Sequence, residues 1–251
     1  MEGKKMQAVL YVGHGSRVKE ARDQAARFME ESMGNNTEPI QEISFLELSH
    51  PTIEEGVRRC VERGATRIAV VPVLLLTAVH AKEDIPYELD RLKKRYPNIP
   101  MSYGRPFGVH SKIVDILMER IYDQDVVIND DAMVLLVGRG SSDPDVKRDL
   151  QEIANQLHAK YPFKRVETCY LAAAKPSFEE GIDQVKQYGH QQVFVVPYLL
   201  FTGILMKSME KTIRKLSAPN QEFILCEYLG YHPNLQEVVF ERTTEAVGVG
   251  I

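Results

Sequence analysis

The stretch VLYVGHGSR, from Val9 to Arg17, is an apolar run that stops at a histidine held between two glycines. A second stretch far downstream, MVLLVGRGSS from Met133 to Ser142, keeps the apolar run, the glycines and a serine but has Arg139 where the first has His14. Glycine lets a chain turn sharply and approach a ligand closely. The two stretches therefore predict a strand and a tight turn that occur twice, with different chemistry at the turn.

Further matches extend this repeat over most of the chain. HPTIEEGV (His50–Val57) matches KPSFEEGI (Lys175–Ile182), at the same offset that separates His14 from Arg139. VVPVLLLTAVH (Val70–His80) matches VVPYLLFTGIL (Val195–Leu205), again at that offset. An unbroken register across separate motifs indicates a tandem duplication. We therefore expect two homologous domains, residues 1–125 and residues 126–251.

Each copy alternates short apolar runs with amphipathic segments. In the first copy we expect strands at 7–12, 40–46, 67–73 and 99–103, and helices at roughly 18–33, 52–63, 82–96 and 111–122. The second copy repeats the strands at 133–137, 165–171, 192–198 and 222–226. This alternation is typical of βαβ units, and continuous apolar runs suit parallel strands covered on both faces. The predicted class is α/β, with two tandem three-layer domains built on parallel sheets.

Composition excludes several classes of partner. The 251 residues include 31 basic and 35 acidic side chains, and no basic face of the kind that binds nucleic acid is visible. The longest apolar run, Ile68–Val79, contains a proline and is too short to span a bilayer, so we read it as a buried strand and the following loop. The three cysteines are far apart, which fits reduced thiols and argues against a cysteine-ligated cluster. The N-terminus is a poor signal peptide, so we expect a cytoplasmic protein without membrane contact.

Three chemically active side chains follow predicted strands of the first copy: His14, Glu47 and His80. Loops at the carboxyl ends of parallel strands gather at one edge of a sheet, so we expect the three in one crevice. Taken singly, each also fits a plain turn, loop or capping residue. Together, two imidazoles and a carboxylate suit a first-row metal such as iron or cobalt and can move protons. Their counterparts in the second copy are Arg139, Ala172 and Leu205, which predicts a single active site on the first domain, facing the second.

The remaining histidines have structural interpretations. His110 and His232 match each other at a predicted helix start in both copies, which indicates a shared role in the fold. The sequence contains no G-x-x-x-x-G-K-[ST] phosphate loop and no G-x-G-x-x-G fingerprint, so nucleotide binding has little support.

The segments YVGHGSR, LELSHPTIEEG and VVPVLLLTAVHAKEDIP closely resemble the sirohydrochlorin chelatases of sirohaem and cobalamin synthesis, in the long form with two homologous domains. The resemblance implies two flavodoxin-like domains of the chelatase fold around a cleft. It implies that His14 and His80 are catalytic and bind the metal, and that Glu47 is the active-site acid and a third ligand. The implied reaction is insertion of Fe²⁺ into sirohydrochlorin, giving sirohaem and two protons, with the metal as substrate and no prosthetic group.

The resemblance leaves alternatives open. Cobalt insertion for cobalamin synthesis would use the same ligands, and a carrier that holds a metal or a tetrapyrrole without turnover would show the same sequence. A histidine-based phosphatase is weaker, because no arginine precedes His14. The tetrapyrrole is rich in carboxylates whereas the chain has a net charge of −4, so we expect binding by local cations next to the repeated motifs. The candidates are Arg17, Lys82, Arg139 and Lys207. We expect a monomer, since the duplication supplies two domains in one chain.

Overall fold

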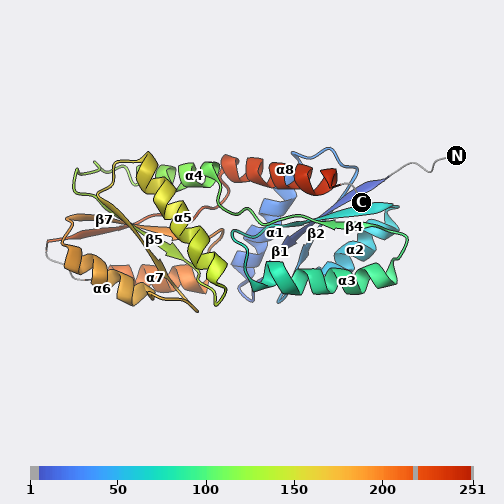
Figure 1. Ribbon diagram of the computed structural model, residues 1–251, viewed down its shortest axis with the longest axis horizontal. Helices are drawn as coiled ribbons and strands as arrows, with labels where there is room; N and C mark the ends of the chain where they lie inside the picture. Colours follow the sequence, from blue (N-terminus) through green and yellow to red (C-terminus); the bar gives the residue numbers. More distant parts are fainter. Residues whose placement is uncertain (1–5, 217–219, 250–251) are drawn as a thin grey trace. The chain divides into compact units, whose positions relative to one another are not determined.

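The computed structural model describes residues 6–216 and 220–249, which form two four-stranded, entirely parallel sheets (Figure 1). The first sheet has the order β2-β1-β3-β4 and consists of β1 (Gln7–Gly13), β2 (Ile40–Phe45), β3 (Arg67–Pro72) and β4 (Met101–Tyr103). The second has the order β6-β5-β7-β8 and consists of β5 (Met133–Gly138), β6 (Arg165–Tyr170), β7 (Gln192–Tyr198) and β8 (Glu222–Leu225). The two sheets therefore share one topology, as a duplication requires.

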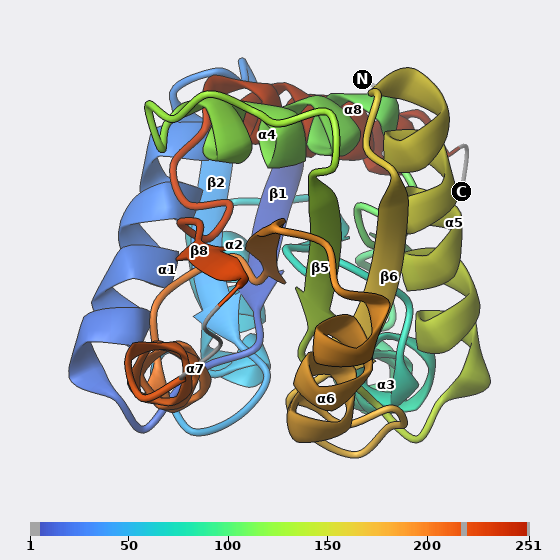
Figure 2. The ribbon, with the colours of Figure 1, turned by 90° about the vertical axis from the view of Figure 1, so that its left-hand side faces the viewer.

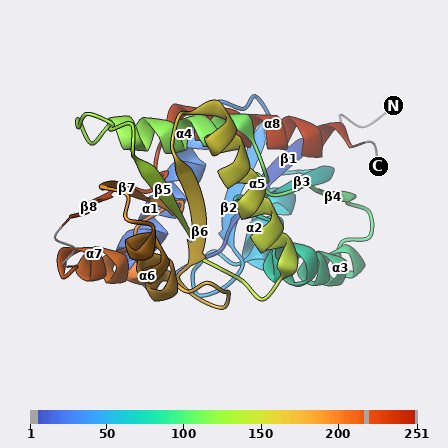
Figure 3. The same cartoon turned by 60° about the vertical axis from the view of Figure 1, so that its left-hand side comes forward.

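Helices cover both faces of each sheet (Figures 2 and 3). The helices of the first copy are α1 (Lys19–Met33), α2 (Ile53–Glu62), α3 (Ile85–Arg95) and α4 (Ser111–Tyr122), with a π-helical turn η1 (His80–Asp84) before α3. Those of the second copy are α5 (Pro144–Lys160), α6 (Phe178–Tyr188), α7 (Ile204–Arg214) and α8 (Pro233–Gly248). Alternate residues of β1 pack toward α2 and α3, and its intervening residues are equally buried. The predicted three-layer α/β class is confirmed.

The longest apolar run of the sequence is a buried strand and the segment after it, as predicted. Its first residues belong to β3, where Ile68–Val71 are completely buried. Within residues 6–216 and 220–249, no helix combines the length and the apolar character that crossing a bilayer requires.

The compact units of the structure differ from the predicted division at residues 125 and 126. The first unit runs to Gly108 and includes the chain from Leu235 onward, whereas the second runs from Val109 to Asn234. The reason is that α4 packs on α5 and β7, while α8 belongs to the first unit and bonds β4 of the first sheet. The Ser102 hydroxyl on β4, for example, donates to the Ala246 carbonyl at 2.8 Å. The predicted boundary therefore separates the repeats in sequence but not the packed units.

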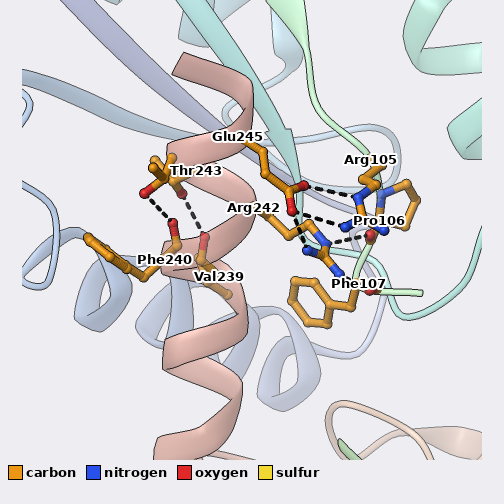
Figure 4. A network of polar contacts seen from close by, with 9 residues as sticks. Arg105, Pro106, Phe107, Val239, Phe240, Arg242, Thr243 and Glu245 are labelled. Atoms are coloured by element: carbon orange, nitrogen blue, oxygen red, sulfur yellow. Dashed lines mark hydrogen bonds and ion pairs between the residues drawn. The ribbon is translucent and has the colours of Figure 1, made fainter. Parts of the chain in front are cut away.

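A buried arginine fixes α8 to the first unit (Figure 4). Arg242 is 2% exposed; it donates from Nε to the Pro106 carbonyl at 3.1 Å and from Nη2 to the Phe107 carbonyl at 2.6 Å. Its charge is paired with Glu245 on the same helix, at 2.9 Å. The Phe107 N–H in turn donates to the Leu74 carbonyl, in the segment that follows β3. The last helix of the chain thus supports the loop that leads to His80.

Candidate metal centre

The strand order brings the three predicted site residues to one edge of the first sheet. β1 lies between β2 and β3, with Gly13 paired to Phe45 and Val12 paired to Pro72, so the three strands end at the same level. His14 follows β1 directly, Glu47 comes two residues after β2, and His80 opens η1 beyond β3. Parallel register therefore places His14 and Glu47 close together. The segment after β3, which accepts from the Phe107 and Gly108 N–H groups at Leu74 and Leu75, carries His80 to the same edge.

The turn after His14 passes directly against the backbone of the next loop. Gly15 has φ +97°, and a Cβ atom at this position would lie 1.8 Å from the Glu47 carbonyl oxygen. Both the dihedral and the space exclude any side chain here. The Glu47 N–H donates to the His14 carbonyl at 3.1 Å, so the two loops form a continuation of the β1–β2 ladder.

Ser49 binds the same two loops together through its side chain. Its hydroxyl accepts from the Ser16 N–H at 3.0 Å and donates to the Ser16 carbonyl at 3.1 Å. Ser49 is buried, and its counterpart in the second copy is Ala174, which cannot make either bond. This fixes the relative position of the His14 and Glu47 backbones in the first unit only.

The donor atoms of the three side chains converge. His14 Nε2 lies 3.5 Å from Glu47 Oε1, and the His14 and His80 rings meet edge to face with centroids 4.7 Å apart. One ligand atom from each of the three residues lies within 4.8 Å of the others. Atoms that ligate a single ion at about 2.1 Å lie roughly 3 to 4 Å apart, so small side-chain movements would complete a metal site.

Hydrogen bonds at Nδ1 select the ligating nitrogen of both imidazoles. His14 Nδ1 lies 3.1 Å from the Gly15 carbonyl, and His80 Nδ1 lies 2.7 Å from Asp84 Oδ2. A carbonyl or a carboxylate only accepts, so both of these hydrogen bonds require the tautomer with the proton on Nδ1, which leaves the lone pair on Nε2. A metal-bound histidine normally has this arrangement, with the second nitrogen held by an oxygen.

Asp84, the partner of the His80 ring, is a candidate site residue that the sequence analysis missed. Asp84 falls in the predicted helix 82–96, which gives it no role in the site. Its spacing of four residues from His80 places the two side chains on one face of a helical segment. A histidine followed at this spacing by a carboxylate, next to a strand end, is the signal that could have found it.

The four predicted cations are all exposed, and they divide between the two units. Arg17 lies three residues after His14, and Lys82 lies on η1 two residues after His80, both in the first unit. In the second unit, Arg139 follows β5 at the position that matches His14, and Lys207 lies on α7 at the position that matches Lys82. The structure therefore places Arg17 and Lys82 in loops that carry the three converging side chains.

The second unit keeps the backbone of the centre but not its ligands. Gly140 has φ +91°, and a Cβ there would lie 1.8 Å from the Ala172 carbonyl, which repeats the geometry of Gly15. The side chains that follow the strands are Arg139, Ala172 and Leu205, none of which ligates a metal. Across residues 6–216 and 220–249, His14, Glu47 and His80 form the only group of three or more potential ligands.

The remaining ligand-type residues have other roles. His110 and His232 each accept a backbone N–H at the start of α4 and α8, which confirms the predicted shared fold role. Burial raises the pKa of all three cysteine thiols, Cys60, Cys169 and Cys226, to about 12. Since the thiolate is the form that binds metal, these residues do not compete for an ion near neutral pH.

Two histidines and a carboxylate that converge at the edge of a duplicated α/β fold are the donor set expected of a metal chelatase. The sequence model of one family, described as CbiX, matches the chain twice, over residues 8–124 and 133–246. The chain therefore belongs to the CbiX family, and each match covers one of the two repeats.

Named relatives agree with this class. A sirohydrochlorin ferrochelatase of Priestia megaterium is 58% identical over 93% of this chain and 88% of its own. A sirohydrochlorin cobaltochelatase of the same organism is 37% identical over 98% of this chain and 82% of its own. The solved structure of SirB from Bacillus subtilis with Fe³⁺ superposes with a TM-score of 0.87 at 47% identity, covering 96% of both chains.

Adding a methyl group at residue 15 tests the close approach of the two loops. Gly15→Ala should lower the free energy of unfolding by more than about 2 kcal/mol, because φ and the Glu47 carbonyl both exclude a Cβ. Gly140→Ala is the matched control, since it meets the same obstruction in the unit without ligands. Urea denaturation should show similar losses for both variants, whereas Co²⁺ titration should show weaker binding only for Gly15→Ala. Equal Co²⁺ binding by the two variants would contradict the role given to this turn.

Removing the Asp84 carboxylate tests whether it holds the His80 ring. Asp84→Ala should weaken Co²⁺ binding about 10- to 100-fold, because His80 loses the acceptor at Nδ1 that fixes its tautomer and orientation. Asp84→Asn keeps an acceptor oxygen at the same position and should recover most of the affinity. Calorimetric titration of the substrate-free protein measures both, and unchanged affinity in the alanine variant would exclude the role.

Proposed function

We propose that this chain inserts Fe²⁺ into sirohydrochlorin to form sirohaem. The observation that carries the proposal is the convergence of the His14 and His80 imidazoles with the Glu47 carboxylate, with an oxygen acceptor beside Nδ1 of each ring. Such a donor set holds a divalent metal at one face and leaves other coordination positions for the nitrogens of a macrocycle.

The reaction needs ligands for the ion and acceptors for two protons. Insertion breaks two pyrrole N–H bonds, forms the metal–nitrogen bonds and releases two protons. We assign His14 and His80 to the metal through Nε2. A nitrogen that ligates the ion cannot accept a proton at the same time, so Glu47 is the proton acceptor that remains once both imidazoles are engaged. Its side chain is 44% exposed, so a proton on its carboxylate can leave to water.

Cobalt is the second candidate metal. The same ligands serve Fe²⁺ and Co²⁺, and affinity rises only one step between them in the divalent series. Identity favours iron, because the ferrochelatase relative is 58% identical and the cobaltochelatase relative 37%. A carrier that binds without turnover is distinguished by product beyond one equivalent of protein.

The chain itself needs no prosthetic group under this proposal, because the metal and the tetrapyrrole are both substrates. We further propose that the protein acts as a monomer in the cytoplasm. The duplication supports the monomer, since it supplies a homologous domain within one chain. Buried, protonated thiols support the cytoplasmic location, since they fit a reducing compartment.

We also propose that Arg17, Lys82, Arg139 and Lys207 bind the carboxylates of the substrate. Each is exposed and each lies beside a repeated strand-end motif, where a ligand at the sheet edge would meet it. The chain carries a net charge of −4, so local cations are needed to attract a polyanion.

Loss of either imidazole should abolish efficient insertion. His14→Ala and His80→Ala should each lower kcat about 100-fold or more, because a metal ligand is lost in each case. His50→Ala is the matched control, since His50 lies next to the Glu47 loop with a side chain that is 81% exposed. Anaerobic incubation with sirohydrochlorin and Fe²⁺ or Co²⁺, followed by loss of the metal-free absorption spectrum, measures turnover and metal preference together. Wild-type activity in either variant would contradict the assignment of that histidine as a metal ligand.

Charge reversal tests the four cations. Arg17→Glu, Lys82→Glu, Arg139→Glu and Lys207→Glu should each raise KM for sirohydrochlorin roughly two- to tenfold with a smaller change in kcat, in proportion to the modest energy of an exposed ion pair. Lys94→Glu, in the last turn of α3, is the matched surface control. Added salt should reduce the differences. KM values that stay at the wild-type level across all four would refute this part.

A further inference from the structure

The helix that carries His80 is built differently from its counterpart in the second repeat. His80–Asp84 form a π-helical turn, in which the Ile85 N–H donates to the His80 carbonyl five residues earlier. The matching segment, Ile204–Arg214, is an α-helix throughout. A π-turn places one extra residue in a helical turn and therefore changes the direction in which the residues before it point.

Pro86 accounts for the wider turn. In an α-helix its ring would collide with the carbonyl of Lys82, four residues earlier, and it has no N–H to donate. Its counterpart in the second repeat is Lys211, which has a backbone N–H and lies within an uninterrupted α-helix. Widening the turn by one residue relieves the collision but leaves one carbonyl without its backbone donor.

That carbonyl belongs to Ala81, and a tyrosine on β4 provides the missing donor. In the π pattern Ala81 would accept from residue 86, which is the proline. The Tyr103 hydroxyl donates to the Ala81 carbonyl instead, at 2.9 Å. Burial raises the pKa of Tyr103 far above its usual value, so the hydroxyl remains a donor at any physiological pH. Ala81 itself is buried, so water is a poor substitute for this bond.

The second repeat lacks every part of this arrangement. The sheet register matches Tyr103 with Leu225, because each pairs at the end of the edge strand, with Val70 and Val195 respectively. Leu225 has no hydroxyl. None is needed there, because Lys211, the counterpart of Pro86, has a backbone N–H of its own. Asp84 and His80, which bond to each other across the π-turn, are replaced by Met209 and Leu205.

We infer that Pro86 and Tyr103 are positioning residues that build the π-turn and thereby aim the His80 ring at the metal. The inference rests on the proposed role of His80 as a metal ligand. Pro86 forces the turn, and Tyr103 binds the Ala81 carbonyl, which the turn leaves without a backbone donor. The turn then sets His80 Nδ1 at 2.7 Å from Asp84 Oδ2, which leaves Nε2 of His80 for the metal.

The test deletes one hydroxyl and compares it with an equivalent deletion elsewhere. Tyr103→Phe removes only the donor to Ala81. Tyr11→Phe is the matched control, because Tyr11 is a completely buried tyrosine of the same sheet whose hydroxyl bonds Gln41 and Asn36, away from the strand ends that carry the site. Three quantities are measured for each: the melting temperature, the Co²⁺ affinity and visible spectrum of the substrate-free protein, and kcat and KM for insertion.

Tyr103→Phe should weaken Co²⁺ binding and lower kcat by about 10-fold, with KM for the tetrapyrrole nearly unchanged. Tyr11→Phe should lower the melting temperature and leave the Co²⁺ spectrum, kcat and KM at wild-type values. Pro86→Ala serves as the second variant: it removes the cause of the π-turn and should alter the Co²⁺ spectrum although no ligand is changed. It also keeps the test decisive if Tyr103→Phe fails to fold.

Wild-type Co²⁺ binding and kcat in both Tyr103→Phe and Pro86→Ala would overturn the inference, whatever their melting temperatures. His80→Ala, measured alongside, separates this failure from failure of the proposed function. If His80→Ala loses metal binding and turnover while Tyr103→Phe keeps them, only the positioning role is wrong. If His80→Ala also keeps them, the assignment of His80 as a ligand is wrong and the inference falls with it.

Discussion

The close passage of the chain past the Glu47 carbonyl is the constraint on which the centre depends. Only glycine fits at residue 15, and this contact sets the separation of the loops that carry His14 and Glu47. The same contact recurs at Gly140 in a unit without ligands, so it belongs to the fold. The candidate site residues of the first unit are therefore carried by a backbone turn that brings two strand ends together in both units.

Much of this arrangement follows from the sequence. The repeated motifs and the apolar runs predict the parallel sheets, and strand bounds agree with the structure to within a residue or two. The convergence of His14, Glu47 and His80 is predictable because side chains that follow adjacent parallel strands share one edge. The sheets follow from the repeat and the apolar runs, and the convergence follows from the adjacency of the strands, so neither prediction requires a side-chain distance.

The exchange of the last helices could not be predicted in this way. Arg242 bonds the Pro106 and Phe107 carbonyls in the first unit, and its counterpart Arg120 bonds the Leu229 carbonyl in the second. Because the two repeats carry the same arginine and the same kind of acceptor, the sequence does not tell which helix belongs to which sheet. The π-turn, by contrast, had a local signal: Pro86 falls within the predicted helix 82–96, where a proline disrupts the regular pattern.

The differences between the repeats indicate how the centre is tuned. Capping boxes at Thr52 and Ser177 are the same in both units, so the framework is kept. Ser49, Asp84 and Tyr103, which hold the ligands in place, are all replaced in the second repeat by apolar residues. Yet the candidate ligands number only three, their side chains are partly exposed, and their donor atoms are spread over as much as 4.8 Å. A structural metal site closes around its ion with four ligands. A firmly positioned but incomplete set suits a metal that must leave for a macrocycle.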